Sequence, residues 1–511
     1  MGTRRIATRR RTLARVLFAL AIIHGLSLTL GHMVNQELTL ATVACGVVGM
    51  AALAIIARQL VRMPPGTLLA TVVASVALWV VYLQKYVILL QVPSVAYDPH
   101  AQPILNDALL DVSTLNKSYE LSTVGVVGFS IAVLALSIVR RPGLISPTSE
   151  YGARNLSANA VLPLRVFAVL VWLVTSAVTA VFGLSVMGTA GVELPYRLAG
   201  LIFYARMILV PLLLVSAETV RMRAGNRISW VFLLLLLCTS ITDAILRGSK
   251  GSILVSLLIV VLFWLSTWIR GRDILSGKHA LACVAVGVVS IAGMRIMGEY
   301  RDIRVASGGL NAVEFSDTAT NIYGDLGSRG LIAAGAAGLA QRLTGIEQLA
   351  VIVKNIESPL WRQYAQLSAE GGVSSYLTRR VYGYGPNVAM GVAPSYFGWW
   401  VAMFGSSGAF FGGIALGTSP VLVSVVGLRF FPDLIEVWEI MGVFLFLNVL
   451  LEGTIDGAWV PLLVLVGSCI GARYVLRHWQ PHTRTTRGNL APGNYRRPRA
   501  AKRPKGEVES V

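Results

Sequence analysis

The feature that most constrains this chain is a series of about twelve apolar runs, most of them close to the roughly 20 residues that a helix needs to cross a membrane. The chain is 55% hydrophobic and only 14% charged, and its mean hydropathy is +0.67, which excludes an ordinary soluble fold. The runs lie at 16–30, 38–56, 68–90, 121–139, 166–186, 198–216, 230–246, 253–268, 281–297, 406–428, 434–451 and 458–475. The sequence therefore predicts an all-α polytopic membrane protein with about 12 transmembrane helices.

The formal net charge of +19 raises the question of a nucleic-acid partner. The basic residues, however, gather at the chain ends and beside the apolar runs, where membrane topology explains them without any nucleic acid. The arginine-rich start followed by residues 16–30 is similar to a signal peptide, but no small-residue cleavage site follows it. We therefore expect a retained first span.

The basic residues of the short loops predict the orientation of the spans, because such flanks stay in the cytoplasm. With twelve spans, one side collects Arg58, Arg62, Arg140, Arg141, Arg221, Arg223, Arg227, Arg270, Arg272, Lys278 and Arg429. The N-terminal arginines and the basic tail fall on the same side. We expect a multi-pass protein of the cytoplasmic (inner) membrane with both termini in the cytoplasm.

Five regions follow from this topology. They are a basic cytoplasmic N-terminus (1–15), spans one to nine (16–297), a large extracytoplasmic loop (298–405), spans ten to twelve (406–475) and a disordered basic cytoplasmic tail (480–511). Within the large loop, the apolar stretches 331–343 and 346–356 are too short to span a bilayer. We expect them to form short helices that rest on the outer membrane surface.

Several kinds of site are not indicated. The four cysteines each lie inside an apolar run, which is typical of packing residues rather than of disulfides or zinc ligands. We find no nucleotide-phosphate loop and no His or Asp/Glu cluster with metal-ligand spacing. The sequence thus predicts no cofactor and no metal site.

Charged residues in or beside a membrane are costly and therefore mark candidate sites. Arg206 lies about two turns into the sixth run, where either a structural partner or a polar cavity can explain it. Asp243 and Arg247 are four residues apart, so they can pair on one helical face. Arg247 and Lys250 then form a basic turn at the outer boundary of the membrane. This is an exception to the rule that basic residues of short loops stay in the cytoplasm.

The ninth run ends in a second charged cluster, with Arg295, Glu299, Arg301 and Arg304. Because guanidinium groups bind phosphate oxygens through two parallel hydrogen bonds, arginines from two spans at one boundary predict a seat for a phosphate or diphosphate head group. Arg342 adds positive charge within the large loop. With no metal predicted, arginine would neutralise the charge of a leaving group.

Glycine-rich motifs in the second half of the chain resemble the O-antigen polymerase family, the Wzy-type oligosaccharide repeat-unit polymerases. They comprise residues 247–251 (Arg-Gly-Ser-Lys-Gly), 342–345 (Arg-Leu-Thr-Gly), 391–398 (Gly-Val-Ala-Pro-Ser-Tyr-Phe-Gly) and 404–408 (Phe-Gly-Ser-Ser-Gly). A large outer loop before the last three spans is a further similarity. The motifs include Ser395 and Tyr396, which we expect to contact substrate.

The resemblance implies a metal-independent glycosyltransferase that joins undecaprenyl-diphosphate-linked oligosaccharide units on the outer face of the membrane. The expected partners are these lipid-linked oligosaccharides, membrane lipids, and a flippase or chain-length regulator. In this interpretation Arg247 and Arg295 are catalytic. Glu299 is our choice of general base, with Glu370 and Glu452 as alternatives.

Three other functions stay open. A transporter or lipid-linked glycan flippase also fits about twelve spans and an intramembrane arginine, although the position of the large loop does not divide the chain into two equal halves. A glycosyltransferase that uses acidic residues in a long first outer loop fits less well, because that loop spans only about residues 31–37. A noncatalytic assembly protein is the last alternative.

Overall fold

The structure is a computed structural model. It describes residues 2–34, 39–91, 103–139, 158–182, 198–247, 249–272, 277–307, 317–325, 327, 330–332, 334–335, 345–369, 371–384, 392–453 and 455–478. This described part contains helices and no strand. Twelve of its helical segments are long and apolar enough to cross a membrane, and each coincides with one run predicted from the sequence. The prediction of an all-helical, multi-pass membrane protein is confirmed.

Nine of the twelve segments are single helices, namely α1 (Gly2–Val34), α2 (Leu40–Leu60), α6 (Val112–Val139), α7 (Val161–Phe182), α10 (Trp230–Arg247), α11 (Lys250–Ile269), α12 (Gly277–Ser307), α18 (Ser406–Phe430) and α20 (Trp459–His478). A tenth, α19 (Ile435–Glu452), follows a short 3₁₀ turn. Two others contain a π-helical turn: α3–η1–α4 (Pro65–Leu78, Trp79–Gln84, Lys85–Gln91) and α8–η5–α9 (Leu198–Tyr204, Ala205–Leu209, Val210–Arg223). Such turns often occur at functional sites.

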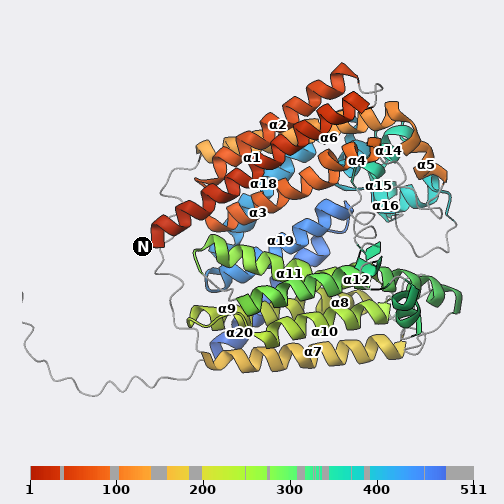
Figure 1. The fold of residues 1–511 in the computed structure, drawn as a ribbon. Helices are drawn as coiled ribbons and strands as arrows, with labels where there is room; N and C mark the ends of the chain where they lie inside the picture. Colours follow the sequence, from red (N-terminus) through yellow and green to blue (C-terminus); the bar gives the residue numbers. More distant parts are fainter. Residues whose placement is uncertain are drawn as a thin grey trace, which may run out of the picture.

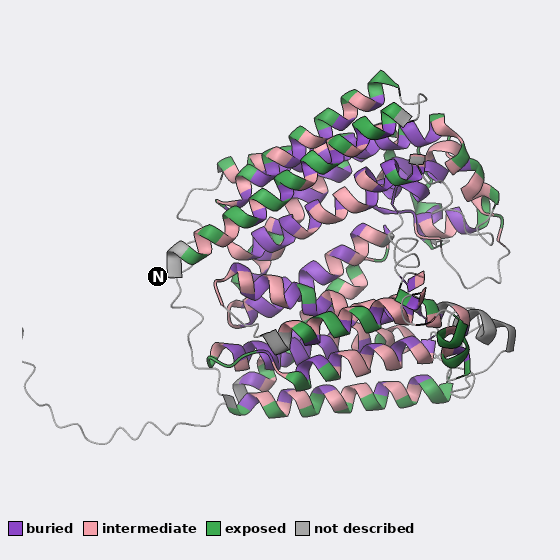
Figure 2. Cartoon of the chain, in the orientation of Figure 1, coloured by how far each residue is buried: buried purple, intermediate pink, exposed green. Residues whose placement is uncertain are grey.

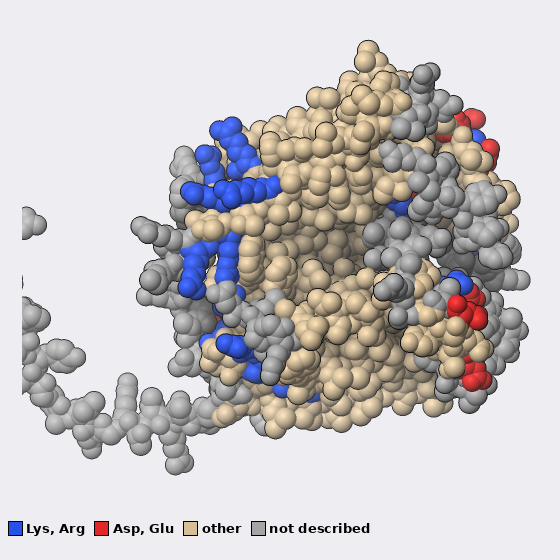
Figure 3. All heavy atoms as spheres, in the orientation of Figure 1, with Lys and Arg blue, Asp and Glu red and all other residues tan. Residues whose placement is uncertain are grey.

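The helices form two groups with α19 between them (Figure 1). Helices α1, α2, α3, α4, α6 and α18 pack together, and helices α7 to α12 and α20 pack together. Helix α19 contacts members of both groups, including α3, α18, α9 and α11. Between the groups the surface is hollowed over uncharged residues (Figure 3).

Burial follows the expected pattern for a protein in lipid, with a buried interior and apolar side chains on the outer faces (Figure 2). Helix α7 is the clearest example, because Leu170 and Val174 are 52% and 62% exposed although they lie mid-helix. In water such a face would be unfavourable, whereas in a membrane it contacts acyl chains. The exposed apolar faces therefore support the membrane assignment independently of helix length.

Helices α6 and α18 approach each other closely because glycines face glycines. A Cβ atom on Gly413 would overlap the carbonyl oxygen of Gly125, and one on Gly128 would overlap the carbonyl of Phe410. One helical turn beyond Gly413, a Cβ on Gly417 would lie 2.7 Å from the Cβ of Ala132. Small residues at such positions let membrane helices pack backbone to backbone.

Lysine and arginine gather at the end of the bundle where α1 begins, and we call this the basic end (Figure 3). By the alternation of the spans, Arg58 at the end of α2 and Arg270 beyond the end of α11 reach the same end. The acidic residues visible in Figure 3 lie at the opposite end. The charge asymmetry expected from the sequence is therefore present in three dimensions.

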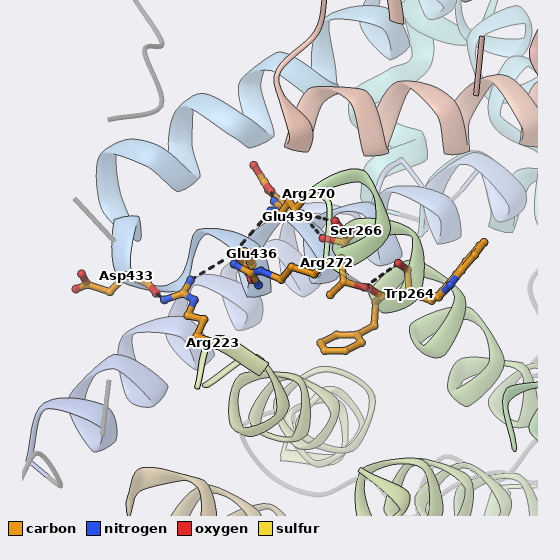
Figure 4. A network of polar contacts seen from close by, with 10 residues as sticks. Arg223, Trp264, Ser266, Arg270, Arg272, Asp433, Glu436 and Glu439 are labelled. Carbon is orange, nitrogen blue, oxygen red and sulfur yellow. Dashed lines mark hydrogen bonds and ion pairs between the residues drawn. The ribbon is translucent and has the colours of Figure 1, made fainter. Parts of the chain in front are cut away.

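A network of arginines and glutamates ties helices together at the basic end (Figure 4). Glu436, in the first turn of α19, lies 2.8 Å from Arg272 Nη2, 3.8 Å from Arg223 Nη2 and 3.9 Å from Arg270 Nε. Glu439, one turn later, pairs with Arg270 and contacts Gly66 at the start of α3. Carboxylates at a helix N-terminus also interact favourably with the helix dipole.

Short helices occupy the segment between α12 and α18 at the opposite end. They are α14 (Ile346–Asn355), α15 (Tyr364–Ala369), α16 (Gly372–Tyr376) and α17 (Tyr396–Phe404), joined by turns that include η7 (Leu377–Val381). We expected residues 331–343 and 346–356 to form short helices on the outer membrane surface. Most of 331–343 lies outside the described residues, whereas α14 forms the helix expected in 346–356. Residues 346–352 are buried, because α14 packs against α17, α6 and the short helix α5 (Pro103–Leu110).

Candidate functional site

A buried cluster of charges lies between α7, α8–η5–α9, α10 and α11, where Asp243 pairs with both Arg206 and Arg247. Pro211 follows the π-helical turn η5, and because proline has no N–H the regular hydrogen-bond pattern is interrupted there. Arg206 lies within this turn, roughly 12 Å from the start of α8 by helical rise, and is 6% exposed. Such a position requires polar partners inside the protein.

Two arginines share one carboxylate in this cluster. Arg206 Nη2 lies 2.8 Å from Asp243 Oδ1, and its Nη1 donates to Thr179 Oγ1 at 3.1 Å. Arg247 Nη1 donates to Asp243 Oδ2 at 3.2 Å and to Ser252 Oγ at 3.4 Å. The predicted pairing of Asp243 with Arg247 is confirmed, and Asp243 additionally bridges to the sixth span.

The cluster carries more positive than negative charge and more donors than acceptors. Two guanidinium groups face a single carboxylate, which leaves one positive charge uncompensated among the described residues. The Nε atoms of Arg206 and Arg247 have no hydrogen-bond acceptor among those residues, while Arg206 Nη2 is engaged by Asp243. The ring of Phe203, 4.2 Å from the Arg247 guanidinium carbon, supplies a weaker cation–π contact. Buried N–H groups of this kind favour an anionic ligand.

A cavity of about 20 Å³ adjoins the cluster, which is room for about one water molecule. Its lining comes from four helical segments and includes Trp172, Arg206, Met207, Pro211, Thr239, Ser240, Asp243, Ser252 and Val255. The sequence left open whether Arg206 has a structural partner or lines a polar cavity. Both are present, since the guanidinium pairs with Asp243 and also borders this space.

Arg295 and Glu299 lie one turn apart on α12 and form an ion pair, with side chains 44% and 36% exposed. In the part of the chain that the structure describes, no hydrogen bond or ion pair joins Arg295 to Arg247. Their helices are nevertheless neighbours, because Ala244 of α10 packs in one apolar cluster with Met294 and Met297 of α12. The two predicted catalytic arginines thus belong to adjacent helices that end at the same side of the bundle.

Several predicted site residues lie wholly or partly outside the described residues. Lys250 lies in the first turn of α11, and Arg301 and Arg304 lie in the last turns of α12, but their side chains are outside the described residues, as is that of Glu452. Arg342, Glu370 and the tail 480–511 lie wholly outside them. Their predicted roles stay predictions.

Ser395 and Tyr396 are fully or nearly fully buried where the loop enters α17. Ser395 has a φ of 61°, the one positive value among the described residues other than glycine, and its hydroxyl accepts from the N–H of Gly398. The Tyr82 hydroxyl accepts from the N–H of Phe397 at 3.1 Å, and Tyr396 donates to the carbonyl oxygen of Gly412 at 3.0 Å. Burial raises the pKa of Tyr396. These contacts fix the end of the loop, and neither side chain faces an open surface.

A second buried pair joins this region to the third span. Lys85, directly after the π-helical turn η1, pairs with Glu347 in the first turn of α14. The Glu347 carboxylate also accepts from the N–H of Gly345 at 3.2 Å. Sequence reasoning missed this pair, because 262 positions separate its members and no periodic pattern links them.

Metal binding is not indicated by the described residues, which contain no group of three or more His, Cys, Asp or Glu side chains arranged to hold an ion. Comparison with known proteins gives no further guide. No family model, no curated protein and no solved structure matches the chain.

Proposed function

We propose that this protein is a polysaccharide polymerase that joins undecaprenyl-diphosphate-linked oligosaccharide units on the outer face of the cytoplasmic membrane. The observation that carries the proposal is the Arg206–Asp243–Arg247 cluster, with its excess positive charge, its two unpaired Nε–H groups and its adjoining cavity. The resemblance of the glycine-rich motifs to Wzy-type polymerases supplies the reaction class.

In this proposal the cluster binds one oxygen of the lipid diphosphate, because the adjoining cavity has room for about one water-sized group. Transfer of the growing glycan to a hydroxyl of a new lipid-linked unit breaks the bond between sugar and diphosphate. Negative charge then develops on the diphosphate, and preorganised guanidinium groups in a dry site stabilise it without a metal. A base must take the proton of the acceptor hydroxyl, and we assign Glu299 on α12, with Arg295 beside it, to the reacting end of the site.

The test measures glycan length in a strain that lacks the native gene and expresses variants at matched abundance. We expect Arg206→Ala and Arg247→Ala to yield single-unit or short glycans, because each removes charge-assisted contacts of roughly 1.5 to 3 kcal/mol. Arg247→Lys should keep partial activity, since lysine retains the charge but loses the planar fork. Arg473→Ala, at the basic end, serves as control, and full-length polymer from both cluster variants would reject the proposal.

The orientation has its own test, because the proposal requires the basic end in the cytoplasm. In a cysteine-free background we expect an impermeant thiol reagent to label Tyr364→Cys in intact cells and to spare Asn226→Cys, which follows α9 at the basic end. Labelling of Asn226→Cys from outside would reverse the topology.

One observation favours a second candidate, a flippase or transporter for a lipid-linked glycan. The structure has two helix groups with a hollow between them (Figure 3), and Arg270 pairs with Glu439 at the basic end. A transporter that is closed on one side of the membrane would have this arrangement. Deletion of the gene distinguishes the two. Loss of a polymerase leaves single repeat units on the cell surface, whereas loss of a flippase leaves lipid-linked units on the cytoplasmic leaflet.

A further inference from the structure

Among the described residues, Glu218 and Asp243 are buried carboxylates that each pair with two arginines, and their hydrogen bonding differs. At the basic end, Glu218 accepts from Arg165 at 2.9 Å, from Arg221 at 3.0 Å and from the N–H of Ser229 at 2.7 Å. Both oxygens of Glu218 are hydrogen-bonded, so this cluster has a structural role that its own contacts satisfy. At the opposite end, Asp243 Oδ1 is paired with Arg206 but has no aligned hydrogen bond.

The Asp243 cluster is therefore held together by charge, while part of its hydrogen-bonding capacity is unused. The Nε atoms of Arg206 and Arg247 have no hydrogen-bond partner among the described residues, and the Arg206 side chain is only 4% exposed. Arg206 and Asp243 both line the cavity, which has room for about one water-sized group, so a ligand oxygen placed there would compete with Asp243 for the Arg206 guanidinium. The ligand class that fits is a phosphate or diphosphate, whose oxygens match guanidinium donors.

We propose that the Asp243 carboxylate competes with a diphosphate for Arg206 and Arg247, and thereby sets how tightly these arginines bind the diphosphate. This inference rests on the proposed function and deepens it. A carboxylate beside the seat keeps the net charge at one positive unit, where its loss would leave two in a medium of low dielectric. The two arginines then bind the leaving lipid diphosphate weakly enough to release it, and product release limits the turnover of many enzymes. Asp243 is thus a positioning residue rather than a catalytic one.

The experiment titrates inorganic pyrophosphate into the purified full-length protein in lipid nanodiscs and measures the dissociation constant by calorimetry. We expect Asp243→Asn, which keeps the shape but removes the charge, to bind pyrophosphate at least tenfold more tightly than wild type. Adding Arg206→Gln to that variant should abolish the gain. The matched control is Glu218→Gln, which removes the carboxylate of the other cluster and should leave the dissociation constant within twofold of wild type.

A purely structural role for Asp243 predicts a different result. In that case Asp243→Asn would loosen the seat, and pyrophosphate would bind equally or more weakly, which would overturn the proposal. The same conclusion follows if neither protein binds pyrophosphate. If Asp243→Asn does not fold, Thr179→Val removes the neutral acceptor of Arg206 and keeps the carboxylate. It should tighten binding severalfold, and unchanged or weaker binding would count against the competition.

Failure of this inference and failure of the proposed function give different outcomes. If Asp243→Asn binds pyrophosphate more tightly but deletion of the gene leaves glycan length unchanged, the role of Asp243 as a competitor is supported and the polymerase function is rejected. If deletion shortens the glycan but Asp243→Asn gains no affinity for pyrophosphate, the polymerase function is supported and the role of Asp243 as a competitor is rejected. If both hold, cells with Asp243→Asn should make polymer more slowly despite tighter binding.

Discussion

Lys85 in the third span and Glu347 at the start of α14 form an ion pair with side chains only 8% and 6% exposed. This pair holds a helix of the segment between α12 and α18 onto a membrane span. Removing one partner of a buried pair leaves the other charge uncompensated, whereas replacing both by apolar residues is often tolerated.

We therefore expect Glu347→Gln to lower the free energy of unfolding by about 3 to 5 kcal/mol. The double variant Lys85→Met, Glu347→Leu should regain most of that loss. Thermal unfolding of the purified proteins measures both. As a control, Lys354→Ala removes the exposed ion pair with Asp107 and should lower the free energy of unfolding far less than Glu347→Gln. Equal losses in the single and double variants would contradict this account.

Glu436 provides a second test, because three arginines surround it at the basic end. Glu436→Gln removes the charge that holds Arg223 and Arg272 near α19. We expect a clearly lower midpoint of thermal unfolding than for Glu299→Gln, whose carboxylate belongs to a half-exposed pair. A similar midpoint for the two variants would mean that the network contributes little to stability.

The start of α6 gives a pH-dependent prediction. Asp111 accepts from the side chains and N–H groups of Ser113 and Thr114 at the N-terminus of the helix. These hydrogen bonds lower the pKa of Asp111 to about 2. A carboxyl whose pKa is depressed in the folded state stabilises that state above its unfolded pKa of about 4, and the contribution disappears as the pH falls towards 2.

Accordingly, Asp111→Ala should cost about 1 kcal/mol at pH 7, the usual value for a lost helix cap. The difference from wild type should shrink between pH 4 and pH 2, as followed by thermal unfolding across that range. Asp107→Ala is the control, because Asp107 is 71% exposed at its side chain and caps no helix. A difference that stays constant down to pH 2 would show that the carboxylate charge is not involved.

The contact between α6 and α18 yields the fourth prediction. Gly413→Leu places a side chain where the backbone of Gly125 lies, so the two helices must separate. Forced overpacking typically costs about 1 to 3 kcal/mol, and more where backbone atoms collide. Gly467→Leu on α20 is the matched control, because a Cβ there would meet no atom within 4 Å. Comparison of detergent-solubilised yield and thermal midpoint checks the expectation.

Sequence reasoning located every span but did not predict how the spans pair. Apolar length alone marks a membrane helix, and the spacing of Asp243 and Arg247 marks a pair within one helix. The contact of Arg206 with Asp243 depends on how two helices are rotated relative to each other, which no local pattern encodes. The same holds for Lys85 and Glu347.

The ends of the helices were also predicted inaccurately from the sequence. Apolar counting placed the start of the fourth span at residue 121, whereas α6 begins at Val112. The intervening turns contain polar residues such as Asn116, which the Tyr86 hydroxyl contacts inside the protein. The two π-helical turns within the spans were likewise not foreseen. The turn η5 carries Arg206, and η1 directly precedes Lys85.

The glycine contact between α6 and α18 also bears on how the protein is made. Helix α6 leaves the ribosome long before α18, since Gly125 and Gly413 are separated by most of the chain. During that interval the backbone surface around Gly125 has no permanent neighbour, so the first four spans remain an incomplete unit in the bilayer. The packing around α6 is completed only when the last three spans have been inserted. A truncated chain that stops before residue 406 should therefore be a substrate for membrane proteases.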